Sequence, residues 1–233
     1  MRKGRVLITG GAAGIGAACA ARCAADGYDV VTIDRVGNGL IADLSDIEST
    51  ASALRCALVD GPITRLVNNV GAVFPADAEH QTLEECEKAW SLNVRVAQQC
   101  MQALLPGMKN EGFGRIVNMS SRAALGKQLR SAYAATKAAL IGMTRVWALE
   151  LGQYGVTANA IGPGVIRTQL FDEANPPGSP LTRAIVEGVP VKRAGTPEDI
   201  AHAVSYMLDD RSGYVTGQVL YVCGGLSVGS API

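Results

Sequence analysis

Long hydrophobic runs and basic stripes are both missing from this chain of 233 residues, and each absence excludes a class of function. The apolar run after Met1-Arg2-Lys3 is soon broken by Gly10 and Gly11, so we expect neither a signal peptide nor a membrane-spanning helix, and we expect a cytoplasmic protein. The 21 Lys and Arg residues balance 21 Asp and Glu residues and are scattered, so nucleic acid is not an expected partner.

Residues that bind metals are also few. Only two histidines occur, His80 and His202, and no CxxC pair is formed by the six cysteines, which are Cys19, Cys23, Cys56, Cys86, Cys100 and Cys223. Cys19 and Cys23 have helical spacing, yet no nearby histidine completes a ligand set. We therefore expect no metal site, and we interpret the cysteines as buried free thiols in a reducing compartment.

What the chain does contain is an alternation of strand-like and helix-like segments, with no repeat and no linker between them. Short apolar runs typical of buried strands lie at 6–9, 30–33, 66–67, 115–119, 156–161 and 219–222. Helical patterns follow the first run to position 25 and fill 47–58, 82–108, 131–151 and 197–208. Apolar strands separated by helices predict a parallel sheet covered on both faces, an α/β fold in a single domain over 1–233.

The second connection between strands is unusually short. Only eight residues separate Asp34 from Asp43, whereas a parallel crossover normally takes about a dozen residues or more and carries a helix. We predict a loop here, turned by Gly37 and Gly39, with no helix between Asp34 and Leu40.

A glycine-rich loop follows the first predicted strand and opens the first helix. It reads TGGAAGIG from Thr9 to Gly16, and its glycines let the backbone turn tightly and approach a pyrophosphate closely. The helix start then offers free N–H groups and the positive end of the helix dipole. Glycine clusters also mark ordinary turns, but a strand before this one and a helix after it predict a nucleotide site.

Tyr133 and Lys137 are four residues apart in a predicted helix, so both side chains project from one face. The phenol of tyrosine has an unperturbed pKa of about 10, which is too high for a base near neutrality. A positive charge roughly 4 Å away lowers that pKa by up to about three units, so the pair is suited to exchange a proton with an alcohol oxygen. A chance pairing on an amphipathic helix is the alternative, and it is disfavoured by Ser120 and Ser121 at the end of the preceding strand.

With these motifs in this order, the chain resembles the short-chain dehydrogenase/reductase family from Arg5 to Gly225. The matching motifs are TGGAAGIG, NNVG at 68–71, Asn93, the serines at the strand end, YAATK at 133–137 and GPG at 162–164. The resemblance implies a doubly wound Rossmann fold with about seven parallel strands. It also implies an oxidoreductase that transfers hydride between a secondary alcohol or ketone and nicotinamide.

The cofactor expected from the sequence is NAD. Asp34 ends the second predicted strand, where a carboxylate accepts hydrogen bonds from the ribose hydroxyls and repels a 2′-phosphate. Arg35 could instead bind a 2′-phosphate, so NADP is the alternative cofactor. Instead of contacting the cofactor, Asp43 could cap the next helix, and Asn68 could tie neighbouring strands together. By resemblance the cofactor also contacts Gly10, Gly14, Ile15, Gly16, Asp43, Leu44, Asn69, Gly71, Tyr133, Lys137, Pro163, Gly164, Ile166 and Thr168.

The resemblance assigns catalysis to Asn93, a serine, Tyr133 and Lys137. Tyr133 exchanges a proton with the substrate oxygen, and the serine hydroxyl hydrogen-bonds that oxygen. Lys137 holds the nicotinamide ribose and lowers the pKa of Tyr133, while Asn93 supports a water that reaches Lys137. The family's usual spacing of thirteen residues from the serine to the tyrosine favours Ser120. The local pattern SSRAALG resembles the family's serine motif with a one-residue shorter loop and favours Ser121, which we select.

The substrate is expected to meet an insertion over 167–193, which contains NPPGSP and by resemblance forms a lid. Arg122, Lys127 and Arg130 either attract a carboxylate or phosphate or form a solvated loop face. NAD preference favours alcohol oxidation, and the alternatives are a 3-oxoacyl-[acyl-carrier-protein] reductase using NADPH and a catalytically silent nucleotide-binding protein. The candidates for the substrate pocket are Ala123, Leu125, Lys127, Gln128, Leu129, Phe171 and Leu181.

A homotetramer is the expected assembly. The helical stretches around Met101 and Met143 carry apolar residues beyond what one sheet needs, and residues 219–233 are apolar to the end. Relatives in the family commonly form tetramers through these regions.

Overall fold

The computed structural model describes residues 4–228. Met1-Arg2-Lys3 and residues 229–233 lie outside the described residues. The expectations for the N-terminus, the single domain and the assembly fall in part on these residues. Seven parallel strands form one sheet in the order β3-β2-β1-β4-β5-β6-β7. The doubly wound Rossmann fold is thereby confirmed. The strands are β1 (Arg5–Thr9), β2 (Asp29–Asp34), β3 (Leu40–Ile41), β4 (Arg65–Asn68), β5 (Gly114–Met119), β6 (Val156–Pro163) and β7 (Val219–Val222).

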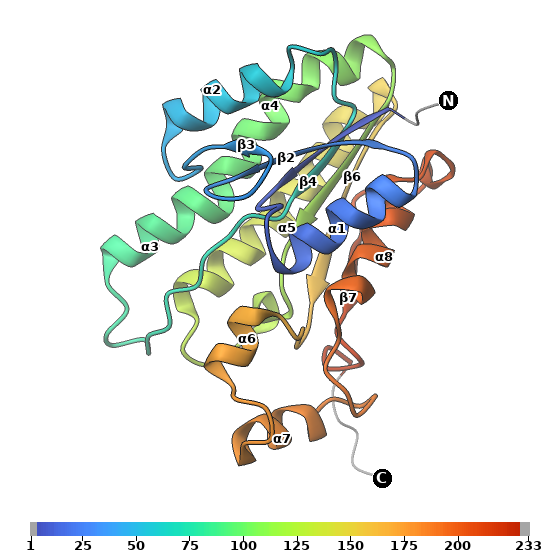
Figure 1. Cartoon of the computed structure of the whole chain (residues 1–233). Helices are drawn as coiled ribbons and strands as arrows, with labels where there is room; N and C mark the ends of the chain where they lie inside the picture. The colour runs from blue at the N-terminus through green and yellow to red at the C-terminus, as the bar shows by residue number, and fades with distance from the viewer. Residues whose placement is uncertain (1–3, 229–233) are drawn as a thin grey trace.

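Helices cover both faces of this sheet (Figure 1). One face carries α1 (Gly14–Ala25) and α8 (Pro197–Leu208), and the other carries α2 (Ile47–Ala57), α4 (Val96–Asn110) and α5 (Ser131–Leu151). Successive side chains of a strand point to opposite faces, so Val6 and Ile8 of β1 enter the first core and Leu7 enters the second. Strands buried on both sides explain why the runs read as continuously apolar.

The short connection after β2 is confirmed. Residues 35–39 contain no helix, and the chain turns directly into β3, which pairs parallel with β2 through Ile33 and Leu40. Gly37 has a φ of +101°, a backbone conformation that glycine adopts at no steric cost. A side chain at Gly39 would begin 2.1 Å from the Thr32 hydroxyl, so both predicted turn glycines are needed.

The predicted helix over 82–108 is divided. It consists of α3 (Leu83–Trp90), a π-helical turn (Ser91–Arg95) and α4, without a break between them. A π turn widens the helix by one residue and is frequent at functional sites. The apolar pattern does not distinguish this turn from an α-helix, so the sequence predicted only one long helix.

The insertion over 167–193 contains two short helices, α6 (Gln169–Ala174) and α7 (Pro180–Glu187), which the sequence analysis missed. The Thr168 hydroxyl caps α6, and the Ser179 hydroxyl caps α7 just before Pro180, a favoured residue at the first helical position. Figure 1 shows both helices beyond the end of the sheet toward which the arrow of β6 points. The insertion therefore lies at the carboxyl edge of the strands.

Four of the six cysteines are buried, namely Cys19, Cys23, Cys100 and Cys223. Burial raises the pKa of the first three thiols to about 12. Cys86 is half-buried and Cys56 is exposed, so the prediction of six buried thiols is wrong for these two. Cys56 lies outside the buried stripe of α2, which runs through Ala53 and Ala57. Within residues 4–228, no three metal-binding side chains gather into a ligand set, and no helix has the length and apolarity to cross a membrane.

The expected surplus apolar face does not include Met101 itself, which is only 5% exposed and packs in the core of its own chain. Met143 packs partly against the same core. The exposed apolar side chains of α5 are instead Val146 (49%) and Leu149 (85%). The end of α5 therefore exposes two large apolar side chains.

Candidate active site

The glycine loop lies where the strand order reverses, between β1 and β4. A crevice forms at such a point because the chain leaves the two strands in opposite directions. The Thr9 hydroxyl accepts hydrogen bonds from the Asn69 and Val70 backbone N–H groups, both at 3.1 Å. The Asn69 amide in turn donates to the Thr9 and Gly10 carbonyls, both at 3.0 Å. These four bonds hold the loop after β1 against the end of β4.

The shape of the loop depends on its glycines. Gly10 has a φ of +67°, and a side chain at Gly16 would begin 1.9 Å from the Gly10 carbonyl oxygen, far closer than any van der Waals contact. Helix α1 begins after Ala13, where no side chain caps the first turn and no acidic residue lies in it. The first N–H groups of α1 are thus available to an anion. Thr168 lies across the loop, since a Cβ on Gly14 would be 3.5 Å from its methyl group.

A cavity of about 280 Å³ adjoins the glycine loop. The Asp34 carboxylate lies at its wall and accepts hydrogen bonds from the backbone N–H of Ala12 at 3.0 Å and of Arg35 at 2.7 Å. These bonds fix a negative charge at the end of β2. The predicted cofactor residues that line this cavity are Gly10, Asp34, Asp43, Leu44, Asn69 and Gly71.

Two structural alternatives are decided by hydrogen bonds. Asp43 does not cap the next helix, because its carboxylate accepts from the Ser45 N–H and hydroxyl, and these bonds lower its pKa. The N-cap of α2 is Asp46. The Asn68 amide donates to the Asn118 side chain at 2.8 Å, so Asn68 does tie β4 to β5.

A second cavity, of about 340 Å³, holds the residues predicted for proton transfer. Asn69 and Gly71 line both cavities, so the two adjoin and together form one long site. Asn93 is buried and, like Gly14 and Gly16, lines neither cavity. The predicted residues that line this second cavity, the active-site cavity, are Ile15, Asn69, Gly71, Ser121, Tyr133, Lys137, Pro163, Gly164, Ile166 and Thr168.

The two serines face different ways. Ser120 is buried, and its hydroxyl donates to the Lys137 carbonyl at 2.7 Å, which ties the end of β5 to α5. Ser121 is half-buried and caps a 3₁₀ turn (Arg122–Leu125), and its side chain is hydrogen-bonded to Tyr133. Only the second hydroxyl therefore meets the phenol.

Lys137 lies beneath Tyr133, with its Nζ 5.5 Å from the ring centroid, and donates to the Met119 carbonyl at 2.8 Å. Burial lowers the pKa of Lys137 to about 8. The pKa of Tyr133 is raised, because burial outweighs the lowering by the Ser121 hydrogen bond and the Arg130 charge. The expected net lowering of the Tyr133 pKa is therefore wrong for the protein's own groups, because burial is the larger effect.

Asn93 holds the backbone that borders the site. From the π-helical turn, its Oδ1 accepts from the Ala72 N–H at 2.7 Å, and its amide donates to the Ala72 carbonyl at 3.0 Å and the Thr136 hydroxyl at 2.9 Å. These bonds keep Gly71 so close that a Cβ there would be 3.2 Å from the Lys137 Nζ. The sequence analysis missed Thr136; its position directly before Lys137 was the available signal.

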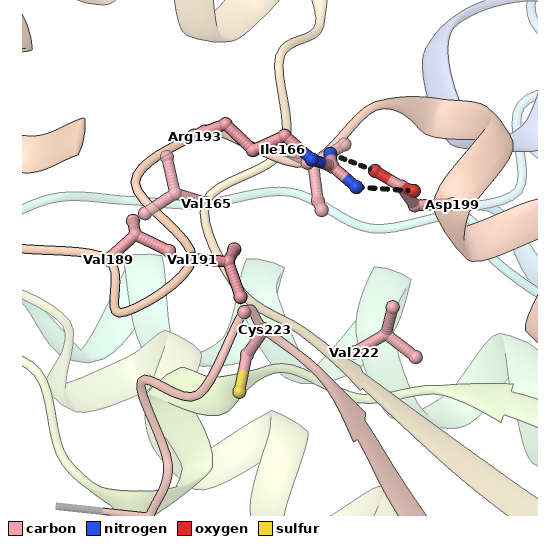
Figure 2. A pocket seen from close by; sticks show the side chains of 10 residues that line it. Val165, Ile166, Val189, Val191, Arg193, Asp199, Val222 and Cys223 are labelled. Carbon is pink, nitrogen blue, oxygen red and sulfur yellow. Dashed lines mark hydrogen bonds and ion pairs between the residues drawn. The ribbon is translucent and has the colours of Figure 1, made fainter.

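The segment after β6 separates the active-site cavity from a larger one of about 400 Å³ (Figure 2). Figure 2 shows Arg193 turned toward Asp199, with hydrogen bonds of 2.6 and 3.0 Å that lower the pKa of Asp199 to about 2. The other labelled side chains are mostly valines, such as Val189 and Val191. Asp199, the only carboxylate among the described residues of this wall, is committed to an ion pair, so the larger cavity offers no free carboxylate.

Part of the predicted substrate pocket lies at the active-site cavity. Ala123, Lys127 and Phe171 line the active-site cavity, and Phe171 belongs to α6 of the insertion. The cavity is not lined by Leu125, Gln128, Leu129 or Leu181, which are exposed. None of the residues of α7 is buried, so α6 supplies the contact of the insertion with this cavity.

Comparisons with known proteins agree with this architecture. A family model described as Enoyl-(Acyl carrier protein) reductase matches residues 39–227. The chain is 35% identical to (2S)-[(R)-hydroxy(phenyl)methyl]succinyl-CoA dehydrogenase subunit BbsD of Thauera aromatica, over 95% of this chain and 96% of that protein. It is 34% identical to the 3-oxoacyl-[acyl-carrier-protein] reductase MabA of Mycobacterium tuberculosis, over 96% and 93%. A blue fluorescent protein from a metagenomic library, solved in complex with NADPH, has a TM-score of 0.89 and 33% identity over 97% and 98% of the chains.

Proposed function

The chain belongs to the short-chain dehydrogenase/reductase family of oxidoreductases, and we propose that it transfers hydride between a secondary alcohol or ketone and NAD. The observation that carries the proposal is the meeting of Ser121, Tyr133 and Lys137 in one cavity that adjoins the glycine loop. A hydroxyl, a phenol and an ammonium are the groups that proton exchange with an alcohol oxygen needs.

The residues present fit a dinucleotide. The uncapped start of α1 and the tight glycine loop suit a pyrophosphate, and the Asp34 carboxylate suits ribose hydroxyls. When bound, the nicotinamide supplies or accepts the hydride. Pro163, Gly164, Ile166 and Thr168 would hold its carboxamide end beside the active-site cavity.

The proton is handled by the chain's own residues. Tyr133 gives its phenolic proton to a ketone oxygen or takes one from an alcohol, while the Ser121 hydroxyl donates a hydrogen bond to the same oxygen. Lys137 has Nζ at the cavity wall, where it would hold the nicotinamide ribose. The Asn93 amide is already used by Ala72 and Thr136, so any support of a water near Lys137 would come from the backbone of its π-helical turn.

A test of the whole proposal compares NAD and NADP as cofactors across a panel of secondary alcohols. Turnover is measured by the absorbance of the reduced nicotinamide. We expect turnover with NAD favoured, because a 2′-phosphate meets the negative charge of Asp34. In Asp34→Ala, the KM for NAD rises about 10- to 100-fold, as expected for lost hydrogen bonds to a charged group, and NADP improves beside Arg35. The variant Glu150→Ala, on the exposed side of α5, is the control.

The alternative is a 3-oxoacyl-[acyl-carrier-protein] reductase that uses NADPH. It is favoured by the similarity to MabA and to the NADPH-bound structure. Wild-type preference for NADPH, unchanged in Asp34→Ala, would decide for this alternative. No turnover across the panel despite tight cofactor binding would decide for a silent nucleotide-binding protein.

Single substitutions separate the two serines. Ser121→Ala should lower kcat about 10²- to 10³-fold, the usual cost of removing one donor to a reacting oxygen. Ser120→Ala removes a buried hydrogen bond to the Lys137 carbonyl and should cost about 1 kcal/mol of stability with little loss of kcat. Steady-state kinetics and urea unfolding of both variants check this. Loss of activity in Ser120→Ala alone would reverse the assignment.

We further propose a cytoplasmic homotetramer of single-domain subunits, each with its lid over 167–193. The exposed Val146 and Leu149 of α5 support the assembly, because large exposed apolar side chains on one helix favour burial against another subunit. The position of α6 at the active-site cavity supports the lid.

A further inference from the structure

The charge of the active-site cavity differs from that of the chain. The whole protein carries equal numbers of acidic and basic residues. Among residues 4–228, however, no Asp or Glu lines the active-site cavity, whereas Arg122, Lys127, Arg130 and Lys137 all do. The proposed mechanism uses only Lys137, so three cations remain without a role. We call Arg122, Lys127 and Arg130 the cationic wall.

The cationic wall lacks carboxylate partners among residues 4–228. Neither Arg122 nor Lys127 forms an ion pair or side-chain hydrogen bond with any described residue, and Arg130 donates only to the neighbouring Leu129 carbonyl at 2.7 Å. Partial burial lowers the pKa of Lys127, and the charges of Arg130 and Arg122 lower it further. The three cations therefore lie close enough to repel one another. Such an arrangement is stabilised when an anion binds between them.

The backbone of this loop is also strained. Leu129 has a φ of +59°, which is uncommon for a residue with a branched side chain, and it is exposed, so its own packing does not explain the conformation. The next residue, Arg130, forms a short parallel bridge with Ala76. The strained turn thus places Arg130 at the start of α5, three residues before Tyr133.

The position of the cationic wall separates it from the expected cofactor phosphates. Arg122 directly follows Ser121, and Arg130 lies close enough to Tyr133 for its charge to lower the pKa of the phenol. The cationic wall lines the active-site cavity and is absent from the cavity that Gly10 and Asp34 border. An anion held by the wall would lie on the substrate side, a few bonds from the reacting oxygen.

We propose that the substrate is a hydroxy or oxo compound that carries a carboxylate or phosphate, bound by Arg122, Lys127 and Arg130. The inference rests on the proposed function and names its substrate class. A cavity of about 340 Å³ that also admits the nicotinamide leaves room for a compact anion. Guanidinium groups bind both carboxylate and phosphate oxygens in pairs, so the two sources share one chemistry.

Matched substrates test this proposal. The carboxylate arm compares 3-oxobutanoate and 4-oxopentanoate with their methyl esters. The phosphate arm compares dihydroxyacetone phosphate with dihydroxyacetone. In both arms the measured rate is the oxidation of the reduced cofactor. We expect kcat/KM of the charged member in one arm to exceed that of its neutral partner by about tenfold or more, the gain typical of a charge-assisted hydrogen bond. Arg122→Gln should lower this ratio, and Arg122→Lys should restore part of it. Arg55→Gln, an exposed arginine of α2, is the control.

Equal kcat/KM for charged and neutral members in both arms overturns the inference and leaves the oxidoreductase standing. If no member is reduced, the result counts against the proposed function, and calorimetric titration of the cofactor-loaded protein with 3-oxobutanoate and with inorganic phosphate decides the inference separately. Binding that Arg122→Gln weakens and Arg55→Gln does not supports the anion site. No binding of either anion overturns it.

Discussion

Tyr133→Phe should lower kcat about 10²- to 10⁴-fold, the range that a positioned acid–base group contributes. The substitution removes one oxygen and keeps the ring, which forms part of the active-site cavity above Lys137. Hydride transfer to a ketone leaves an alkoxide oxygen that needs a proton, and no other phenol, carboxyl or imidazole of the described chain lines this cavity. Water would have to take over, at a much higher barrier.

Two measurements separate a chemical role from a structural one. The dissociation constant for the reduced cofactor, from fluorescence titration, should change less than about threefold in Tyr133→Phe, since the lost group is worth little in ground-state binding. The KM should likewise change little, because the phenol acts mainly in the transition state. A variant that keeps kcat within about threefold of the wild type would remove Tyr133 from the mechanism.

Several site residues were predictable because they follow the carboxyl ends of parallel strands. Gly10 follows β1, Asn69 follows β4, Ser121 follows β5 and Gly164 follows β6, and these ends share one edge of the sheet. Motif and topology therefore agree, and the structure brings these residues to two adjoining cavities. Long periodic helices such as α5 were predicted for the same reason, since their signal extends over many residues.

What the sequence missed depends on short or three-dimensional features. β3 has two residues and no pattern of its own, and the π-helical turn at Asn93 has the same apolar spacing as an α-helix. The direction of the pKa shift of Tyr133 depends on burial, which is not a property of spacing. Like the exposure of Cys56, these outcomes follow from packing.

Lys137 lowers the stability of the protein, and Lys137→Met should show it. The ammonium is buried without a carboxylate partner among the described residues, and burial lowers its pKa from 10.5 to about 8. At pH 7 the folded protein thus holds a charge that costs about 3 kcal/mol relative to the unfolded chain. Methionine has a similar shape and no charge, so the free energy of unfolding should rise by up to that amount.

The pH dependence distinguishes this cause from a simple gain in packing. Between pH 8 and 10.5 the unfolded chain binds the proton that the folded protein has lost, so the wild type gains stability as the pH rises. The advantage of Lys137→Met should therefore fall from about 3 kcal/mol at pH 7 to about 1 kcal/mol at pH 10, measured by urea unfolding. Lys109→Met, an exposed lysine of α4, should show no such change. An advantage that stays constant with pH would mean that the pKa of Lys137 is the same in the folded and the unfolded protein, and burial of its charge would then not be what lowers the stability.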